Sequence, residues 1–368
     1  MGFQQTDKEN KMIKNRKLNK LVLGIVCIML LTSACQETEQ TITVTPSDEV
    51  IGENGDALSQ EETLLKNEAL NHPVVRVGTL KGPTGMGMVR LMDQSKMGET
   101  ALNYTFEILD SPDELVSKII SGEVDVAAVP TNVALLLYNK TEGKVMVSAV
   151  NTLGVLYLLE NGNEIHGMRD LKDKTVHVSG KGASPDFILQ YLLREADLIT
   201  NQDVELAYNL QHADLAAAMA EGDVTIGLLP QPHVTTAMIK NPELRIAIDM
   251  TKAWEEANEG HQLAMGVLVT QTAFAKINQE TLNLFLDEYK ESVAYVNENI
   301  EEASILVEAY GILPNAAIAK QAIPLSNIVY MDASVARPFL DAYFEVLYDF
   351  EPNSIGGKLA EDAFYYEK

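Results

Sequence analysis

Cysteine is nearly absent from this chain of 368 residues, which contains only Cys27 and Cys35, both close to the N-terminus. A disulfide framework, a CxxC pair or a cysteine-based zinc site is therefore excluded from the body of the protein. Basic residues are also scarce, with 28 Lys and Arg against 53 Asp and Glu and a net charge of −25. This balance lacks the positive charge by which proteins bind nucleic acid, so we expect no DNA or RNA partner.

Motifs of common enzyme classes are missing as well. The sequence contains no Gly-x-Ser-x-Gly elbow, no HExxH motif and no GxxxxGK[ST] loop. Its six histidines are scattered along the chain, and His233 has no second histidine or acid near it in sequence. We therefore predict no metal site and no cofactor.

The N-terminus has the features of an export signal. Residues 1–20 carry six basic residues, residues 21–31 are apolar, and Thr32, Ser33 and Ala34 precede Cys35. The apolar run of about eleven residues is shorter than the roughly twenty that a membrane helix needs, which favours a cleaved signal peptide. We predict that residues 1–34 are removed and that the rest of the chain is exported, with either Met1 or Met12 as the start of translation.

Two further features follow this signal. The string Leu31-Thr-Ser-Ala-Cys35 resembles the lipobox of bacterial lipoproteins, which implies a palmitate-type lipid anchor on Cys35; the alternative is an ordinary secretory signal with an incidental cysteine. Residues 36–72 contain nine acids, one base and no aromatic residue. Such a composition cannot form a core, so we predict that residues 35–72 are an acidic, disordered tether.

The rest of the chain shows an internal duplication with an offset of 100 residues. Residues 122–134 read GEVDVAAVPTNVA and residues 222–234 read GDVTIGLLPQPHV, each an apolar strand that ends at a proline. Upstream, residues 74–84 (VVRVGTLKGPT) and 174–184 (KTVHVSGKGAS) each run from a β-branched strand into a glycine-rich turn. Strands that alternate with helices at this spacing predict one parallel sheet in each half.

The expected elements can be stated by residue range. Extended runs at 149–159 and 263–270 are predicted to cross between the halves as strands. Helices are predicted over residues 85–94, 111–121, 185–196, 212–221, 281–296, 300–310, 315–322 and 334–350. The predicted domains are therefore a first lobe of residues 73–153 plus 263–368 and a second lobe of residues 154–262.

Ligands of open parallel sheets bind beyond the carboxyl ends of the strands, which in both halves are loops rich in glycine and hydrogen-bonding residues. The candidate ligand-binding residues are Lys81, Gly82, Pro83, Thr84, Gly85, Met86, Pro130, Thr131, Asn132, Asn151, Thr152, Lys181, Gly182, Ala183, Ser184, Gln231, Pro232 and His233. Each could equally be a residue that any strand-to-helix turn requires.

The chemistry of these loops leaves the ligand open. Thr84 and Ser184 are predicted to cap the helices that follow, and free N–H groups at such turns suit a carboxylate, sulfonate or phosphate, with added charge from Lys81 and Lys181. The uncharged side chains and Met86 suit a neutral or heteroaromatic molecule, although a methionine at this spacing also fits the core. No arginine is visible in these loops, which makes a strongly anionic ligand less certain.

The strings VGTLKGPTGMGMVRLM (77–92), NTLGVLYLLE (151–160), DLKDKTVHVSGKGASP (170–185) and SIGGKLAEDAFYY (354–366), with the repeats above, resemble the substrate-binding proteins of ABC importers. The similar branch includes binders of nitrate, taurine, aliphatic sulfonates and thiamine pyrimidines. The resemblance covers residues 73–366 and implies an α/β, bilobal periplasmic-binding-protein fold of type II, in which two parallel-core sheets are joined by two crossing strands.

The same resemblance implies a function. The chain would be an extracytoplasmic, membrane-anchored, monomeric protein that traps a heterocyclic vitamin precursor or a sulfonate- or nitrate-like solute by hinge closure. It would then deliver that solute to an ABC permease and its ATPase. Two alternatives stay open: an enzyme similar to the pyrimidine synthases of thiamine biosynthesis, whose cysteine-rich motif this body lacks, and a ligand-sensing domain.

Overall fold

The fold is described here from a computed structural model, which places residues 72–368 of the chain. The expected signal peptide, the lipid-anchor candidate Cys35 and the expected tether up to residue 71 lie outside the described residues. Within residues 72–368, no helix is both long enough and apolar enough to cross a bilayer.

The first of two sheets, sheet A, has the strand order β11-β4-β10-β3-β1-β2. Strand β1 lies parallel to β2 and β3, whereas β10 runs antiparallel between β3 and β4, and β11 pairs antiparallel with β4. The strands are β1 (Val75–Leu80), β2 (Tyr104–Leu109), β3 (Val126–Pro130), β4 (Val145–Leu153), β10 (Ala264–Gln271) and β11 (Ile328–Asp332).

The second sheet, sheet B, repeats this plan with the order β7-β6-β8-β5-β9. Strand β6 lies parallel to β7 and β8, and β5 runs antiparallel between β8 and β9. The strands are β5 (Leu156–Asn161), β6 (Thr175–Val178), β7 (Glu205–Ala207), β8 (Ile226–Pro230) and β9 (Leu244–Asp249).

Five strands of sheet A, β2-β1-β3-β10-β4, therefore have the same arrangement as β7-β6-β8-β5-β9 of sheet B, as the duplication in the sequence predicts, and β11 is an additional strand of sheet A. Each sheet has the predicted parallel core, β2-β1-β3 or β7-β6-β8, but each is a mixed sheet because a strand from the crossing segments enters it in the opposite direction. Gly266 of β10 pairs with Pro130, and Leu156 of β5 pairs with Pro230, so the inserted strands occupy equivalent positions.

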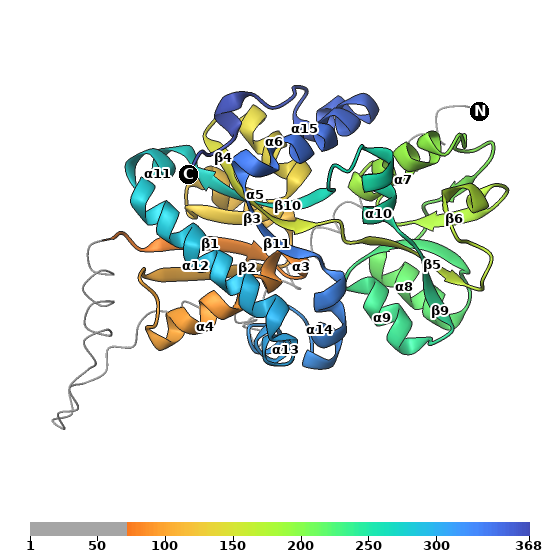
Figure 1. The fold of residues 1–368 in the computed structure, drawn as a ribbon, viewed down its shortest axis with the longest axis horizontal. Coiled ribbons are helices and arrows are strands. Elements are labelled where there is room, and N and C mark those ends of the chain that lie inside the picture. Colours follow the sequence, from red (N-terminus) through yellow and green to blue (C-terminus); the bar gives the residue numbers. More distant parts are fainter. Residues whose placement is uncertain (1–71) are drawn as a thin grey trace, which may run out of the picture. The chain divides into compact units, whose positions relative to one another are not determined.

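Helices cover both faces of each sheet, as alternate strand residues show. Ala127 and Val129 of β3 join a core cluster with α5 (Pro112–Ser121), α6 (Thr131–Lys140) and α15 (Ala333–Phe350) (Figure 1). Val126 and Ala128 join a cluster with α4 (Val89–Met97), α12 (Gln279–Glu298) and α13 (Ile300–Ala309). Successive strand residues point to opposite faces, so near-continuous apolar strands are expected when both faces are covered.

The helices are close to the predicted ones. On the side of sheet A they are α3 (Pro83–Met86), α4 (Val89–Met97), α5 (Pro112–Ser121), α6 (Thr131–Lys140), α11 (Thr272–Ile277), α12 (Gln279–Glu298), α13 (Ile300–Ala309), α14 (Ala316–Ala322) and α15 (Ala333–Phe350). On the side of sheet B they are α7 (Ser184–Glu195), α8 (His212–Glu221), α9 (His233–Lys240) and α10 (Met250–Ala257). Short 3-10 turns are η1 (Met168–Leu171), η2 (Ile323–Leu325), η3 (Pro352–Ile355) and η4 (Asp362–Phe364).

The crossing between the sheets is tightly packed. The predicted single run over 149–159 is divided into β4 and β5 at Gly154 and Val155. The Asn327 side chain donates from Nδ2 to the Gly154 carbonyl at 2.5 Å, and the Leu153 N–H donates to the Asn327 carbonyl at 3.0 Å. A Cβ on Gly154 would collide with Thr251 Oγ1, so only glycine fits this close approach.

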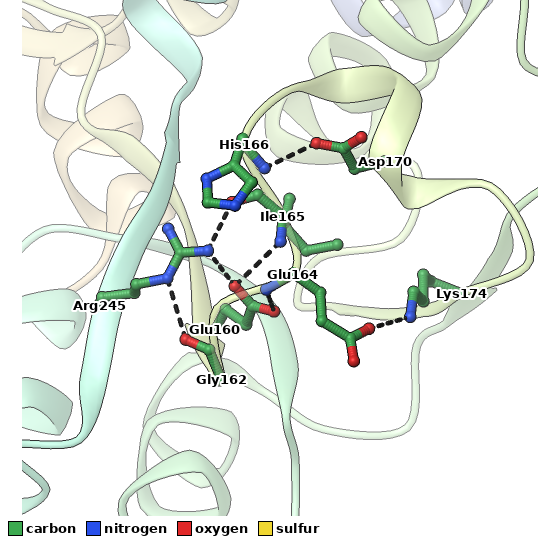
Figure 2. A network of polar contacts seen from close by, with 8 residues as sticks. All are labelled: Glu160, Gly162, Glu164, Ile165, His166, Asp170, Lys174 and Arg245. Atoms are coloured by element: carbon green, nitrogen blue, oxygen red, sulfur yellow. Dashed lines mark hydrogen bonds and ion pairs between the residues drawn. The ribbon is translucent and has the colours of Figure 1, made fainter.

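The far end of β5 is held by a buried ion pair (Figure 2). Glu160, whose side chain is 5% exposed, binds the guanidinium of Arg245 on β9 and accepts from the N–H groups of Glu164 at 2.8 Å and Ile165 at 3.2 Å. Arg245 also donates to the carbonyl groups of Gly162 at 3.0 Å and Ile165 at 2.6 Å. This network fixes the chain that leaves β5, at the edge of sheet B opposite to its strand-to-helix loops.

Candidate functional site

The turn after β1 is fixed by hydrogen bonds to its backbone. Gly82 adopts a φ of 98°, which favours glycine, and is the N-cap of α3. The Thr84 carbonyl accepts from Thr79 Oγ1 at 3.5 Å and from Asn151 Nδ2 at 3.3 Å. The turn is thereby tied to β4, one of the strands that leads to the crossing.

Gly266 brings several predicted residues together. A Cβ at this position would lie 2.7 Å from Asn151 Oδ1, 3.0 Å from Thr152 Cβ and 3.0 Å from Thr84 Cγ2. Gly266 also pairs with Pro130, directly before Thr131. The structure therefore gathers Thr84, Thr131, Asn151 and Thr152, which the sequence assigns to separate loops, around one glycine of β10.

The corresponding turn after β6 also contains glycines with positive φ and is also fixed by a hydrogen bond to its backbone. Gly180 and Gly182 adopt φ values of 83° and 72°, and the Gly182 N–H donates to Asp186 Oδ2 at 2.8 Å. The other oxygen of Asp186 accepts from Tyr208 and Gln190, both at 2.7 Å. The Lys181 ammonium lies 5.1 Å from the centre of the Tyr208 ring, so this cation is held beside the loop.

Gln231 reaches the crossing from sheet B. Its N–H donates to the Val155 carbonyl at 2.9 Å, and its Oε1 accepts from Thr235 at 2.9 Å, in the first turn of α9. The peptide bond between Gln231 and Pro232 is cis. Since Val155 follows Thr152 by only three residues, this bond places Gln231 next to the end of β4.

Buried polar atoms without a partner mark this region. Thr131 Oγ1, Thr152 Oγ1 and Gln231 Nε2 have no hydrogen-bond partner within residues 72–368, although these residues are only 1%, 2% and 3% exposed. Thr131 follows Pro130, two strands away from Thr152, which places it about 10 Å from Thr152 at a strand spacing of about 4.8 Å. Such orphaned groups are rare in proteins, and these three come from segments that follow strands of both sheets.

A second cluster, which the sequence analysis missed apart from His233, lies at the carboxyl edge of sheet B. Ser179 follows β6, His212 begins α8 after β7, and His233 begins α9 after β8. The fully buried Ser179 hydroxyl hydrogen-bonds His212 Nδ1, and the ring of His212 stacks on that of His233 with centroids 5.5 Å apart and 29° between planes. The offset of 100 residues that relates Thr79 to Ser179 is the signal that could have revealed this hydroxyl.

These histidines are held in their neutral form. Burial lowers the pKa of His212, and burial together with the neighbouring His212 lowers the pKa of His233. Both rings also lie at the first position of a helix, where the positive end of the helix dipole disfavours a cation.

Several predicted residues have other roles in the structure. Met86 is fully buried in the core cluster of α4 and α12, which matches the core alternative for this methionine. Lys81 forms an exposed ion pair with Asp110 at 2.7 Å. Pro83 and Gly85 lie within α3, Asn132 within α6, and Ala183 and Pro232 directly before helices.

The predicted helix caps are wrong. Gly82 and Ala183 are the N-caps of α3 and α7, whereas Thr84 and Ser184 lie inside these helices. Pro83, at the first position of α3, starts the helix earlier than predicted, because proline suits that position. The Asp186 carboxylate instead accepts from the Gly182 N–H in front of α7.

No group of three or more His, Cys, Asp or Glu residues within 72–368 is arranged to hold a metal ion. The polar atoms at the crossing are hydroxyl and amide groups, which suit hydrogen bonding to a small organic molecule.

With this geometry in place, comparison with known proteins identifies the family. A family model described as menaquinone biosynthesis matches residues 87–350, which include the elements from α4 to α15. The chain belongs to this family. No curated protein matches the sequence of this member of the menaquinone biosynthesis family.

Solved structures similar to this family member include proteins of ABC transport systems. An ABC transporter protein from Parabacteroides distasonis is 23% identical, with a TM-score of 0.67 over 81% of this chain and 100% of that chain. The periplasmic aliphatic sulphonate binding protein from Escherichia coli is 18% identical, with a TM-score of 0.63 over 80% of this chain and 93% of that one. The likeness confirms the predicted fold, that of periplasmic binding proteins.

Proposed function

We propose that the chain is a solute-binding protein of an ABC importer, which captures a small organic molecule between two lobes. The lobes would be residues 73–153 plus 263–368, built on sheet A, and residues 154–262, built on sheet B. The orphaned polar atoms Thr131 Oγ1, Thr152 Oγ1 and Gln231 Nε2 carry this proposal, because they come from both sheets and need hydrogen-bond partners.

The fold supports the same reading. The strand-to-helix loops of each sheet lie at the carboxyl ends of its parallel strands, the usual ligand-binding edge in α/β proteins. The similar solved structures include a sulphonate-binding protein and an ABC transporter protein.

The finer parts of the proposal rest on the sequence. The basic and apolar segment before Cys35 supports export and a lipid anchor, so the protein would act outside the cytoplasm, attached to the membrane. Its partners would be the solute, a permease and the ATPase of that permease, and the protein itself would be a monomer. A cleaved, lipidated N-terminus can be read by mass spectrometry of the protein from its host.

Capture is proposed to follow a population shift. A solute that hydrogen-bonds Thr131 and Thr152 on one side and Gln231 on the other gains contacts only when both lobes approach it, so it stabilises the closed form. Small-angle X-ray scattering would show a smaller radius of gyration for the loaded protein. An unchanged radius with a bound solute would contradict the hinge.

Native mass spectrometry of the protein purified from its host tests the binding function directly, because a retained solute is identified by its mass. The isosteric variant Thr131→Val and the variant Gln231→Met should each lower the occupied fraction, since each removes an unpaired polar group; Gln231→Met also removes the acceptor of the Thr235 hydroxyl. Thr225→Val is the matched control, because Thr225 is exposed and directly precedes β8, at the end of that strand opposite Gln231. Equal occupancy in all four proteins would contradict the site.

An enzyme is the second candidate function, favoured by the description of the matched family as menaquinone biosynthesis. The two functions differ in stoichiometry. A binding protein retains one solute unchanged, whereas an enzyme converts many molecules for each chain. Incubation of the protein with the solute it retains, followed by mass analysis of the released material, separates them.

A further inference from the structure

We propose that the Ser179–His212–His233 cluster binds the anionic group of the solute and takes up one proton as it does so, which makes capture stronger at lower pH. This inference rests on the proposed binding function and specifies both the chemistry of one end of the solute and the residues that recognise it.

The geometry leaves the outer nitrogens of the two rings available. Ser179 hydrogen-bonds Nδ1 of His212, which fixes the ring and leaves Nε2 as its remaining polar atom. Among residues 72–368, no side chain or backbone group hydrogen-bonds this Nε2 or either ring nitrogen of His233. The stacked arrangement keeps the two rings beside each other at the edge of sheet B.

Two helices direct their N-terminal ends to this place. His212 is the first residue of the ten-residue helix α8, and His233 is the first residue of the eight-residue helix α9; neither helix has a side-chain cap at its N-terminus. Uncapped N–H groups at helix N-termini attract anions. The ends of two such helices are brought together here by the stacking of their first residues.

A further buried polar atom without a partner lies at the start of the same helix, α9. Gln231 is bonded through Oε1 to Thr235 in the first turn of α9, so its side chain lies along the start of that helix. Its Nε2 is buried and has no partner among the described residues. An amide nitrogen only donates, so the missing partner must be an acceptor, such as an oxygen of a carboxylate or sulfonate.

The charges around the cluster favour a gain of one proton on binding. The charged and titratable residues around the cluster come from α8, α9, the strands β6 and β9, the helix α14 and the loop after β6. They are Asp214, Glu221, Lys240, His177, Arg245, Asp249, Lys320 and Lys181. None of these forms an ion pair or hydrogen bond with either ring, and none shifts the pKa of His212 or His233, which burial lowers in both. An anion supplies the missing counter-charge and raises the pKa of the rings, and the repulsion between stacked cations limits the uptake to one proton.

The test uses the full chain, with histidine side chains labelled by ¹⁵N, and inorganic sulfate as the probe. Ring signals of His212 and His233 are titrated with and without sulfate, with chloride at matched ionic strength as the reference. Sulfate should move their midpoints to higher pH and leave the exposed His166 unchanged. Between the midpoints measured without and with sulfate, the apparent affinity for sulfate should rise by up to about tenfold for each unit that the pH falls, as uptake of one proton requires.

Two variants test whether sulfate binding and its pH dependence arise from this cluster. His212→Gln should abolish the pH dependence of sulfate affinity, and Gln231→Met should weaken the affinity while the pH dependence remains. Midpoints that sulfate does not move, or moves equally for His166, would overturn the inference. A retained host solute whose affinity does not change over the pH range of the titration would also overturn the proton uptake, while the binding function would stand. A sulfate response in a protein that retains no solute would support the anion site and contradict the binding function.

Discussion

At the scale of single residues, Gly154 and Thr251 show how little space the crossing has. A Cβ on Gly154 would collide with Thr251 Oγ1 and lie 3.0 Å from Thr251 Cβ and 3.1 Å from Leu263 Cδ2. Both neighbours are well buried, with exposed fractions of 7% and 0%. The crossing therefore depends on the absence of a side chain at one position.

The variant Gly154→Ala should lower the free energy of unfolding by about 1–3 kcal/mol, because the added methyl group overpacks this contact. Chemical denaturation measures the change. Gly167→Ala is the matched control, because a Cβ there meets nothing within 4 Å and the backbone is extended at φ −172°; its effect should stay within about 0.5 kcal/mol. Equal losses in the two variants would contradict the close approach at Gly154.

The histidine pair gives a second prediction at this scale. Because burial lowers the pKa of His212 and His233 below the ordinary 6.5, the folded protein holds fewer protons than the unfolded chain in the range below 6.5. The free energy of unfolding is therefore undiminished above about pH 6.5, where both states hold neutral rings. It falls as the pH drops from 6.5 through the lowered pKa values of the two histidines, because the unfolded chain binds protons first.

Urea unfolding on both sides of pH 6.5 measures this loss in the wild type. The double variant carrying His212→Gln and His233→Gln should lose less stability on acidification, since it lacks both titrating rings. His166→Gln is the control for the loss of a histidine side chain, because this ring is exposed. An identical pH profile for the wild type and the double variant would show that the rings titrate alike in the folded and unfolded states.

At the scale of elements, most helices follow from sequence patterns, and the exceptions have tertiary causes. Helix α8 has the predicted bounds of residues 212–221. The helix predicted over residues 85–94 is instead α3 and α4, separated near Gly87, where a Cβ would lie 2.7 Å from Tyr289 Oη. Contacts with a residue some 200 positions away leave no mark in the local sequence, so this division could not be predicted.

The Glu160–Arg245 pair supplies the element-scale prediction (Figure 2). It joins β5 to β9 and to the chain around Ile165, and Glu160 is almost completely buried. Arg245→Met should cost about 3–5 kcal/mol of stability, because the Glu160 carboxylate loses its counter-charge in a buried position. The double variant with Glu160→Gln should regain part of that loss.

Arg169→Met is the control for the loss of a guanidinium. Arg169 lies 3.6 Å from Asp197, with the two side chains 78% and 90% exposed, so solvent already screens this pair. Its removal should change the free energy of unfolding by at most about 0.5 kcal/mol in thermal or chemical denaturation. If Arg245→Met cost as little stability as Arg169→Met, solvent would have to reach the Glu160 carboxylate.

At the scale of the whole molecule, helix α15 connects the two sheets. It packs beside β4 and α6 and also contacts α7 and α10, where Phe350 stacks on Phe187 at 6.0 Å and Tyr343 meets Trp254 edge-on at 5.8 Å. One continuous core cluster therefore contains residues from both sides of the crossing. We therefore expect this contact to lie close to the pivot of the motion proposed for capture.

A double-mutant cycle on Phe187→Ala and Phe350→Ala measures this contact. We expect a coupling of about 0.5–1.5 kcal/mol, the usual value for a stacked aromatic pair. The cycle on Tyr138 and Phe364, which lie 5.0 Å apart within the sheet A side, is the control for an aromatic contact that the motion does not affect. Solute should change the coupling of the first pair only, and emission from the single tryptophan, Trp254, reports the same rearrangement.

The two similar halves could be predicted from the sequence because strings such as GEVDVAAVP and GDVTIGLLP recur at an offset of 100 residues. Thr131, Thr152 and Gln231 could be predicted from their positions after strands, whereas the burial of their polar atoms without partners is visible only in the structure. The cluster around Ser179 and His212 was missed, because a single hydroxyl and a single histidine 33 residues apart carry no motif. Their proximity arises only when β6 and β7 pair side by side.

The position of β10 has a consequence for the order in which the protein matures. Every strand of sheet B lies between Leu156 and Asp249, whereas sheet A needs β10, from Ala264 onward, to join β4 to β3. A chain that emerges from the ribosome or the translocase N-terminus first can therefore finish the later-encoded sheet before the earlier one. Until β10 follows, β3 has an unpaired edge, and chaperone protection or rapid translocation has its greatest value during that interval.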